Sequence, residues 1–332
     1  MTSMSHVHVA FLDRFHPEIY SAIKRALPEG WEYAFAKSNE SGDQVAAVSG
    51  ADLLFVMAAP VTGEILSAAT RLRFIQKLGA GVDKIDLKTC EQRGIAIARL
   101  AGGNAIPVAE HTLLLMLAAL RRLPLMDRRT RAGDWLKEEA RGVNRQLTGK
   151  RIGLVGFGAI GKALAKLLSG FDIELVYFDP AVSQKEAERQ FHIHFLPLDE
   201  LLATADIVSL HLPLLPETAG LISKDRIARM KHGAVLINCA RGGLVDEEAL
   251  AAALVEGRLF AAGVDAFVKE PPIGSRLLIL DQTVVTPHMA GATVDNFRFV
   301  IERAIRNAVQ YLGGGGLPEG DAVFLPQGTM PA

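Results

Sequence analysis

The sequence is poor in cysteine and in long hydrophobic runs, and each shortage excludes a class of protein. Its 332 residues include only two cysteines, Cys90 and Cys239, which is too few for a disulfide framework and suits a reducing compartment. The longest apolar run, residues 113–120, is too short to cross a bilayer. The first residues, MTSMSHVHVAFL, lack the basic region and the long apolar core of a signal peptide. We therefore expect a cytoplasmic protein without a membrane span.

Net charge is also nearly absent, since its formal value is −1 at pH 7. This balance gives no reason to expect nucleic acid or an anionic membrane as a partner. An arginine-rich stretch at residues 121–131 has no interleaved aromatic residues, so a solvated helix face or salt bridges between subunits explain it better. Histidines alternate at His6 and His8 and at His192 and His194, without a third ligand at metal-site spacing. We expect no metal site.

The composition is that of an ordinary globular protein, with 49% hydrophobic and 22% charged residues, and the length suggests two domains. Short apolar runs alternate with helical patterns, which predicts parallel sheets covered by helices. The predicted strands are residues 7–12, 53–57, 74–78, 95–98, 152–155, 175–178, 194–195, 207–210, 235–237, 262–264 and 284–285. The predicted helices are residues 17–27, 63–70, 86–93, 107–123, 199–203, 224–230, 246–256 and 294–312, with one more after the loop at 156–161.

Residues 152–179 read as a complete nucleotide-binding unit. An apolar strand leads into GFGAIG at 156–161, a helical pattern follows, and a second strand ends at Asp179. A glycine triplet alone can arise by chance, but here the strand, the helix and the acid are all in place. Gly156 permits the tight turn, Gly158 lets the backbone approach a pyrophosphate, and Gly161 lets helix and strand pack closely. Asp179 would bind the ribose hydroxyls and repel a 2′-phosphate, which favours NAD, although nearby Lys185 and Arg189 leave NADP open.

The helix predicted at residues 107–123 is hydrophobic nearly all round and follows the loop AGGN. A helix of this kind is expected to be buried, either between domains or in a subunit interface.

Reactive side chains follow three of the predicted strands: Arg241, Glu270 and His288. In a doubly wound sheet, ligands lie beyond the carboxyl ends of the strands, which is also the edge that carries the glycine loop. Arg241 can clamp a substrate carboxylate with two parallel hydrogen bonds. His288 can protonate a developing alkoxide, while Glu270 orients its ring and keeps it protonated. Taken singly, these are a surface arginine, a helix-capping glutamate and a core histidine. Their common location favours hydride transfer to a 2-keto acid.

Seven motifs between residues 50 and 310 carry a resemblance to a known family. They are LGAGVD (78–83), VAEHTLLLMLAALRR (108–122), GFGAIG (156–161), LHLPLLPETAGLI (210–222), NCARGGLVDEEAL (238–250), DAFVKEPP (265–272) and TPHMAGAT (286–293). The chain resembles the NAD-dependent D-isomer-specific 2-hydroxyacid dehydrogenases, which include glyoxylate and hydroxypyruvate reductases, D-lactate dehydrogenases and phosphoglycerate dehydrogenases. Lys77 stands where arginine is also common in that family, so the 78–83 loop does not indicate which substrate is used.

The resemblance implies residue roles. Arg241 binds the substrate carboxylate and carbonyl, Glu270 orients His288, and His288 is the general acid/base. Leu78, Gly79 and Ala80 form the substrate loop and offer backbone donors. The implied NAD site comprises Gly156, Gly158, Ala159, Ile160, Gly161, Asp179, His211, Leu212, Pro213, Thr218, Cys239, Ala240, Asp265 and Gly291, with Asp265 at the nicotinamide carboxamide. For His211 a structural role is the better interpretation. For Cys239 we expect a role in packing rather than in nucleophilic catalysis.

The resemblance also implies the architecture: two doubly wound α/β domains, with a Rossmann nucleotide-binding domain (102–288) inserted into a flavodoxin-like substrate domain (1–101 and 289–332). Hinges near residues 101 and 289 would let the two close over substrate. A homodimer through the region 107–123 is expected.

Two other functions remain open. Formate dehydrogenases share this fold, but they carry Gln at the position of Glu270. NAD(H)-sensing corepressors retain the same triad, and only the lack of an obvious long interaction tail favours an enzyme. The preferred 2-hydroxy acid and the direction of the reaction do not follow from the residues.

Overall fold

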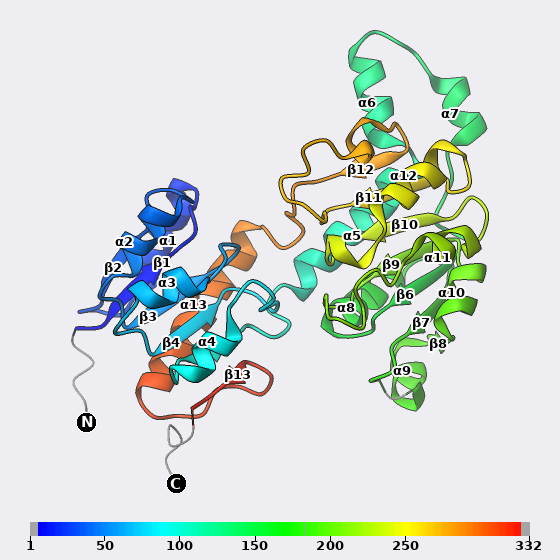
Figure 1. Ribbon diagram of the computed structural model, residues 1–332. Coiled ribbons are helices and arrows are strands. Elements are labelled where there is room, and N and C mark those ends of the chain that lie inside the picture. The colour runs from blue at the N-terminus through cyan, green and yellow to red at the C-terminus, as the bar shows by residue number, and fades with distance from the viewer. Residues whose placement is uncertain (1–5, 183, 327–332) are drawn as a thin grey trace. The chain divides into compact units, whose positions relative to one another are not determined.

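The computed structural model describes residues 6–182 and 184–326. By backbone contacts the chain divides into two compact units (Figure 1), the first drawn from Met1–Asn104 and Thr293–Ala332 and the second from Ala105–Ala292. The domain boundaries expected from the sequence fall a few residues before these. The functions assigned to the two domains stay predictions. Among the described residues, no helix is long and apolar enough to cross a membrane.

The first unit is built on one mainly parallel sheet. Its elements are β1 (His8–Phe11), α1 (Pro17–Ala26), β2 (Glu32–Phe35), α2 (Ser41–Val48), β3 (Leu53–Val56), α3 (Gly63–Ala68), β4 (Phe74–Lys77), α4 (Leu87–Gln92), β5 (Ala96–Ala98), α13 (Val294–Leu312) and β13 (Ala322–Phe324). The strand order is β13-β5-β4-β3-β1-β2, and only β13 runs antiparallel. Strand β3 is buried on both faces, which is why its sequence LLFV is a continuous apolar run.

Two hydrophobic clusters cover the two faces of this sheet. One joins strand residues such as Phe11 and Phe55 to Ile301 and Ala304 of α13. The other joins Leu54 and Ile75 to α2, α3 and α4. The C-terminal helix is therefore part of the core of the N-terminal unit.

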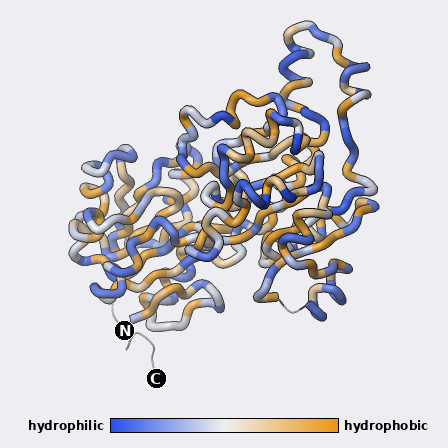
Figure 2. The backbone as a smooth tube through the Cα atoms, turned by 45° about the vertical axis from the view of Figure 1, so that its right-hand side comes forward, coloured by the Kyte–Doolittle hydropathy of each residue, from blue (hydrophilic) through white to orange (hydrophobic). Residues whose placement is uncertain are grey.

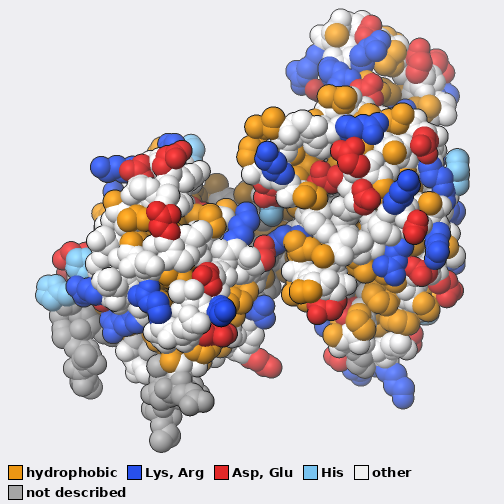
Figure 3. All heavy atoms as spheres, viewed as in Figure 1, with side chains coloured by type: hydrophobic (Ala, Val, Ile, Leu, Met, Phe, Trp, Pro, Cys, Tyr) orange, Lys and Arg blue, Asp and Glu red, His pale blue; other side chains and the backbone are white. Residues whose placement is uncertain are grey.

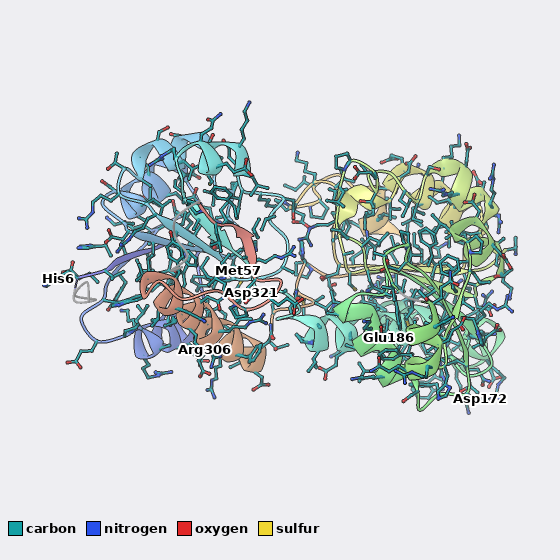
Figure 4. The ribbon with its side chains drawn as sticks, turned by 90° about the horizontal axis from the view of Figure 1, so that it is seen from below. His6, Met57, Asp172, Glu186, Arg306 and Asp321 are labelled. Atoms are coloured by element: carbon teal, nitrogen blue, oxygen red, sulfur yellow. The ribbon has the colours of Figure 1, made fainter. Side chains whose placement is uncertain are left out.

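An ion pair fixes the segment that follows α13. Asp321, labelled in Figure 4, is fully buried and accepts hydrogen bonds from Arg303 at 2.6 Å, from Asn307 at 3.0 Å and from the N–H of Ala101 at 2.9 Å. Each lone pair of a buried carboxylate needs such a donor, because an unpaired buried charge is costly. The pairing joins the segment after α13 to the loop after β5.

The second unit has a seven-stranded parallel sheet. Its elements are α5 (Ala105–Leu120), α6 (Leu123–Arg131), α7 (Lys137–Val143), β6 (Arg151–Val155), α8 (Ala159–Leu168), β7 (Glu174–Phe178), α9 (Gln184–Phe191), β8 (His194–Phe195), α10 (Leu198–Thr204), β9 (Ile207–Leu210), α11 (Lys224–Arg229), β10 (Val235–Asn238), the 3-10 helix η1 (Gly242–Leu244), α12 (Glu247–Val255), β11 (Ala261–Val264), the 3-10 helix η2 (Arg276–Ile279) and β12 (Thr283–Val285). The order β12-β11-β10-β9-β6-β7-β8 is that of a Rossmann sheet extended by one strand.

Helices cover both faces of this second sheet. Residues of α5 and α8 pack with Leu154 and Ile237 on one face, and residues of α10, α11 and α12 pack with Val208 and Leu236 on the other. Figure 2 shows hydrophobic stretches in orange interspersed with hydrophilic ones in blue along the backbone of each unit. Two parallel sheets covered by helices confirm the predicted fold class.

The predicted apolar helix at 107–123 is corrected in its bounds. The helix ends at Leu120, because Arg122 adopts a left-handed backbone conformation (φ 48°), and α6 begins at Leu123. In the single chain Leu114 is 53% exposed and Leu117 is 38% exposed, so burial of the helix between domains or in a subunit interface stays a prediction. Beyond it, α6 and α7 project from the rest of the second unit (Figure 1) and contain no buried residue.

The arginine-rich stretch is exposed in the single chain, which fits both predicted explanations, a solvated helix face or salt bridges between subunits. Arg131 pairs with Asp127 at 2.9 Å and Arg128 with Asp281 at 2.6 Å, all of them more than half exposed. Figure 3 shows side chains of both charges over the projecting α6–α7 segment, with apolar side chains among them.

Candidate active site

The glycine loop lies at the switch point of the second sheet. Strand β6 pairs with β7 on one side and with β9 on the other, so the loop after β6 opens where the strand order reverses. Gly156 has φ +98°, and a Cβ there would lie 2.6 Å from the carbonyl oxygen of His211. Only glycine fits this turn, which brings the β6 and β9 ends together.

The N-terminus of α8 is open. Gly158 is its N-cap and makes no side-chain cap hydrogen bond. A Cβ on Gly158 would meet nothing within 4 Å, whereas one on Gly161 would lie 2.7 Å from the carbonyl oxygen of Gly156. The helix is thus seated close against the strand and keeps free space in front of its first turn. Uncapped N–H groups facing open space suit a phosphate.

Asp179 ends β7 beside this loop. One carboxylate oxygen accepts the N–H of Phe157 at 2.8 Å, and the other accepts the N–H of Ala181 at 2.9 Å. Each oxygen has a second acceptor position. With the open helix end, these groups fit a dinucleotide, since the carboxylate can accept from ribose hydroxyls while the helix faces the pyrophosphate.

The segment after β9 forms the next wall of this loop region. Burial lowers the pKa of His211 to about 4, and its Nε2 lies 2.9 Å from the hydroxyl of Ser209. The ring is therefore neutral at physiological pH and bonded within the protein, consistent with the structural role expected for it. Thr218 donates to the carbonyl of Pro213 at 2.6 Å and accepts the N–H of Leu215 at 2.8 Å, which closes the following turn.

Cys239 is the residue after β10, and its side chain is buried. Burial raises the pKa of its thiol to about 12, against the lowering effect of a hydrogen bond to Thr112. A thiol that stays protonated is a poor nucleophile, which is consistent with the packing role predicted for Cys239; that role stays a prediction.

The turn that carries Arg241 is held by Asn238. The Asn238 side chain donates to the Arg241 carbonyl at 2.9 Å and accepts the N–H of Ala240 at 3.0 Å. A Cβ on Gly242 would lie 1.9 Å from the carbonyl carbon of Phe267. The glycine after the arginine therefore lets the backbone of this turn lie directly against the segment that leads to Glu270.

Glu270 and His288 are in contact. The Oε1 of Glu270 lies 2.7 Å from Nδ1 of His288 and accepts the N–H of Phe267 at 3.3 Å. The ring is 39% exposed and the carboxylate 29% exposed. A carboxylate accepts only, so Nδ1 carries a proton and, in the neutral ring, Nε2 is the nitrogen that can accept one.

Asp265 is fully buried, between the ends of β11 and β12. Its carboxylate accepts the hydroxyl of Thr286 at 2.6 Å and the N–H groups of Met289 at 2.8 Å and Ala290 at 2.9 Å. These bonds hold the segment that contains His288. The expected contact of Asp265 with a nicotinamide carboxamide stays a prediction.

The predicted substrate loop belongs to the first unit. Leu78 is buried and its N–H donates to the carbonyl of Val56 at 2.8 Å, while Gly79 accepts the N–H of Leu100 at 2.9 Å. Gly79 and Ala80 are half-buried. The structure thus gathers Arg241, Glu270 and His288 on neighbouring strand ends of the second unit and builds the 78–80 loop in the first.

Two residues of the site were not identified from the sequence. His111 of α5 lies with its Nε2 3.0 Å from the hydroxyl of Thr286 and 3.6 Å from the Asp265 carboxylate. Both residues fall inside motifs recognised above, VAEHT and TPHMAGAT. Their pairing across 175 positions had no local signal.

A comparison with protein families agrees with this geometry. Residues 113–290 match the family described as "D-isomer specific 2-hydroxyacid dehydrogenase, NAD binding domain". That range covers the glycine loop, Asp179, Arg241, Glu270 and His288.

Individual relatives are similar over most of the chain. A D-3-phosphoglycerate dehydrogenase of Archaeoglobus fulgidus is 40% identical over 80% of this chain and 50% of its own length. A hydroxypyruvate reductase of Thermotoga maritima is 36% identical over 82% of this chain and 89% of its own. The crystal structure of the TT0316 protein from Thermus thermophilus has a TM-score of 0.84 at 33% identity and covers 96% of this chain and 100% of that one. The chain spans about half the length of the phosphoglycerate dehydrogenases it matches.

Proposed function

Because the chain belongs to the D-isomer-specific 2-hydroxyacid dehydrogenase family, we propose that it transfers a hydride between NAD(H) and a small D-2-hydroxy acid or 2-keto acid. The observation that carries the proposal is the 2.7 Å contact between Glu270 and His288 at the sheet edge that also bears the open helix end of α8. The relatives named hydroxypyruvate reductase and D-3-phosphoglycerate dehydrogenase support substrates of the hydroxypyruvate and phosphohydroxypyruvate type.

His288 is the proposed general acid/base. Its Nδ1 is committed to Glu270, so Nε2 gives a proton to the oxygen of the substrate carbonyl during reduction and takes it back during oxidation. The adjacent carboxylate fixes the ring in one orientation and faces the positive charge of the protonated ring. Bound NADH would supply the hydride to the carbonyl carbon.

Arg241 is the proposed carboxylate clamp. Its guanidinium is always charged and presents paired donors that match a carboxylate. One of its Nη groups donates to the Ala240 carbonyl at 2.8 Å, which steadies the side chain beside its own turn. The backbone of Leu78, Gly79 and Ala80 is proposed to contribute further donors to the substrate.

The proposed cofactor site surrounds the glycine loop. Gly158, Ala159 and Ile160 offer the first-turn N–H groups of α8 to the pyrophosphate. Asp179 accepts the ribose hydroxyls, which favours NAD over NADP. The remaining proposed contacts are Gly156, Gly161, His211, Leu212, Pro213, Thr218, Cys239, Ala240, Asp265 and Gly291.

A homodimer is the proposed assembly. Support comes from exposed apolar side chains on and between α5, α6 and α7: Leu114, Leu117, Leu123, Trp135 and Val143. Trp135 is 79% exposed in the single chain, and large exposed aromatic side chains are typical of interface cores. Both cysteines are buried free thiols, which supports a reducing compartment such as the cytoplasm.

One panel tests the proposed reaction. Oxidation of NADH and of NADPH is measured with glyoxylate, pyruvate, hydroxypyruvate, phosphohydroxypyruvate and a bulky 2-keto acid. We expect turnover with NADH on at least one of them and a weaker rate with NADPH. A clear preference for NADPH would contradict the role of Asp179, and NADH binding without turnover on any acid would favour a sensor.

Two variants test the residue roles. We expect His288→Ala to lower kcat by about a hundredfold or more with NADH affinity intact. Arg241→Ala should mainly raise KM for the 2-keto acid. His194→Ala, an exposed histidine on β8, is the matched control and should behave as wild type. Near-normal turnover in both site variants would rule out this mechanism.

A further inference from the structure

The backbone of His288 is in a conformation that needs support. Its φ is +52°, in the left-handed region. For a residue with a side chain, that region is sterically unfavourable, so it persists only where surrounding bonds fix the turn. The direction of the His288 ring depends on whatever holds this turn.

Asp265 supplies those bonds from both sides of His288. Its backbone carbonyl accepts the N–H of His288 at 2.8 Å. Its carboxylate accepts the two following N–H groups, those of Met289 and Ala290, and the hydroxyl of Thr286 two residues before. The left-handed turn is thus wrapped around one buried carboxylate.

His111 completes the network from the helix behind it. A hydroxyl has one hydrogen, and that of Thr286 is given to Asp265, since an ionised carboxylate can only accept. Thr286 must therefore accept from its other neighbour, Nε2 of His111, at 3.0 Å. His111 is 8% exposed, and the same Nε2 lies 3.6 Å from the Asp265 carboxylate.

Resting on the role given to His288 above, we propose that His111 is a positioning residue: through Thr286 and Asp265 it holds the left-handed turn that presents the His288 ring to Glu270 and the substrate. Loss of the His111 donor leaves the Thr286 oxygen without the hydrogen bond that it accepts from His111. It also removes a polar N–H group near the negative charge of the Asp265 carboxylate. The turn then relaxes, and the His288 ring moves away from the orientation in which it contacts Glu270. The cost falls on the chemical step, because displacement of a reacting group by about 1 Å lowers rates by roughly a hundredfold.

Two variants that remove a hydrogen-bonding group and two conservative variants test the network. His111→Phe and Thr286→Val remove the donor and the hydroxyl while keeping the volume. His111→Gln and Thr286→Ser keep an N–H donor and a hydroxyl. The matched control is Thr283→Val on β12, three residues before Thr286, because the Thr283 hydroxyl is also buried but shares its one hydrogen between the carbonyls of Leu277 and Leu280, each 2.7 Å away.

Two readouts are compared, and one does not depend on turnover. The imidazole nitrogens of His288 are observed by NMR in ¹⁵N-histidine protein, assigned with His288→Gln. Steady-state kcat, KM and NADH affinity are measured in parallel. We expect His111→Phe and Thr286→Val to shift the His288 resonances and to lower kcat about ten- to a hundredfold, with KM and NADH affinity little changed. The two conservative variants should recover most of the rate, and Thr283→Val should move neither readout.

Unchanged His288 resonances and kcat in both removal variants would overturn the proposal, and so would an equal loss in Thr283→Val. If the wild-type protein reduces none of the 2-keto acids, the proposed function fails separately. The positioning role is then decided by NMR alone: shifted His288 signals in the removal variants support it, and unshifted signals refute it.

Discussion

At the scale of single residues, the two glycines of the cofactor loop have opposite surroundings. Gly156 is enclosed, with a left-handed φ and the His211 carbonyl 2.6 Å from where a Cβ would stand. Gly158 faces open space at the N-terminus of α8. The same substitution should therefore act on stability at one position and on binding at the other.

We expect Gly158→Ala to leave the free energy of unfolding within about 0.5 kcal/mol of wild type, because the added methyl meets no protein atom. The methyl occupies the space proposed for the pyrophosphate, so NADH affinity should fall about tenfold or more, a loss of about 1.4 kcal/mol. Gly156→Ala should instead lower the free energy of unfolding by more than about 2 kcal/mol. Urea unfolding and NADH fluorescence titration check both. Full NADH affinity in Gly158→Ala would contradict the site.

At the scale of elements, an ion-paired carboxylate joins the starts of three strands in the second unit. Asp206, just before β9, accepts the N–H of Arg151 on β6 at 3.0 Å and pairs with Lys231, before β10, at 2.7 Å. Burial raises the pKa of Asp206, but the hydrogen bonds from Lys231 and Arg151 and the nearby positive charges outweigh it, so the net pKa lies below its usual value.

This lowered pKa predicts an acid-sensitive contribution to stability. The ionised carboxylate is favoured in the folded state, so its contribution is complete above the unfolded pKa of about 3.9 and is lost as pH falls through the folded pKa. Asp206→Asn should be less stable than wild type at pH 7, and the gap should shrink below about pH 4. Urea midpoints from pH 7 to pH 3 measure it. Asp199→Asn, in an exposed pair with Arg226, is the control and should change little. A gap undiminished at pH 3 would refute this account.

The elements that could be predicted from the sequence are the buried ones. Parallel strands covered on both faces, such as β3 and β9, leave continuous apolar runs. Strand β2 was missed because it lies at the sheet edge with three exposed residues, and its sequence EYAF has no such run. Helix α9 was missed because QKEAERQF has only one buried residue, Ala187, so no apolar stripe marks it.

For the site, the sequence predicted which residues follow strand ends and that Glu270 orients His288, but not the hydrogen bonds around Asp265. Strand topology brings the ends of β10, β11 and β12 to one edge. The common location of Arg241, Glu270 and His288 could therefore be predicted from the sequence alone. The direction of the Asp265 carboxylate could not be predicted, because it is set by partners on β12 and α5. Such pairings depend on packing between elements distant in sequence, for which spacing gives no signal.

At the scale of the whole molecule, the proposed dimer surface consists of the exposed apolar side chains on and between α5, α6 and α7. We expect Trp135→Glu, with Leu117→Glu as a second variant, to convert a dimer to a monomer in light scattering after size exclusion, because each places a charge in an apolar interface. NADH binding by each monomer should persist. Val268→Glu, also an exposed apolar side chain (63% exposed), is the control. A wild-type monomer, or dimers of undiminished strength in both variants, would refute the proposed assembly.

The first unit takes its core from the two segments that flank the second unit in the sequence. Ile301 and Ala304 of α13 pack with Phe11 and Phe55 of strands made more than two hundred residues earlier. On a ribosome, one face of the sheet of the first unit therefore stays incompletely covered until α13 is synthesised, because α1 alone packs on it before then, whereas the second unit is contiguous and can close at once. Exposed apolar strands are prone to aggregate during such a wait. The order of folding is inverted relative to the order of synthesis: the inserted unit closes first, and the unit that begins the chain closes last.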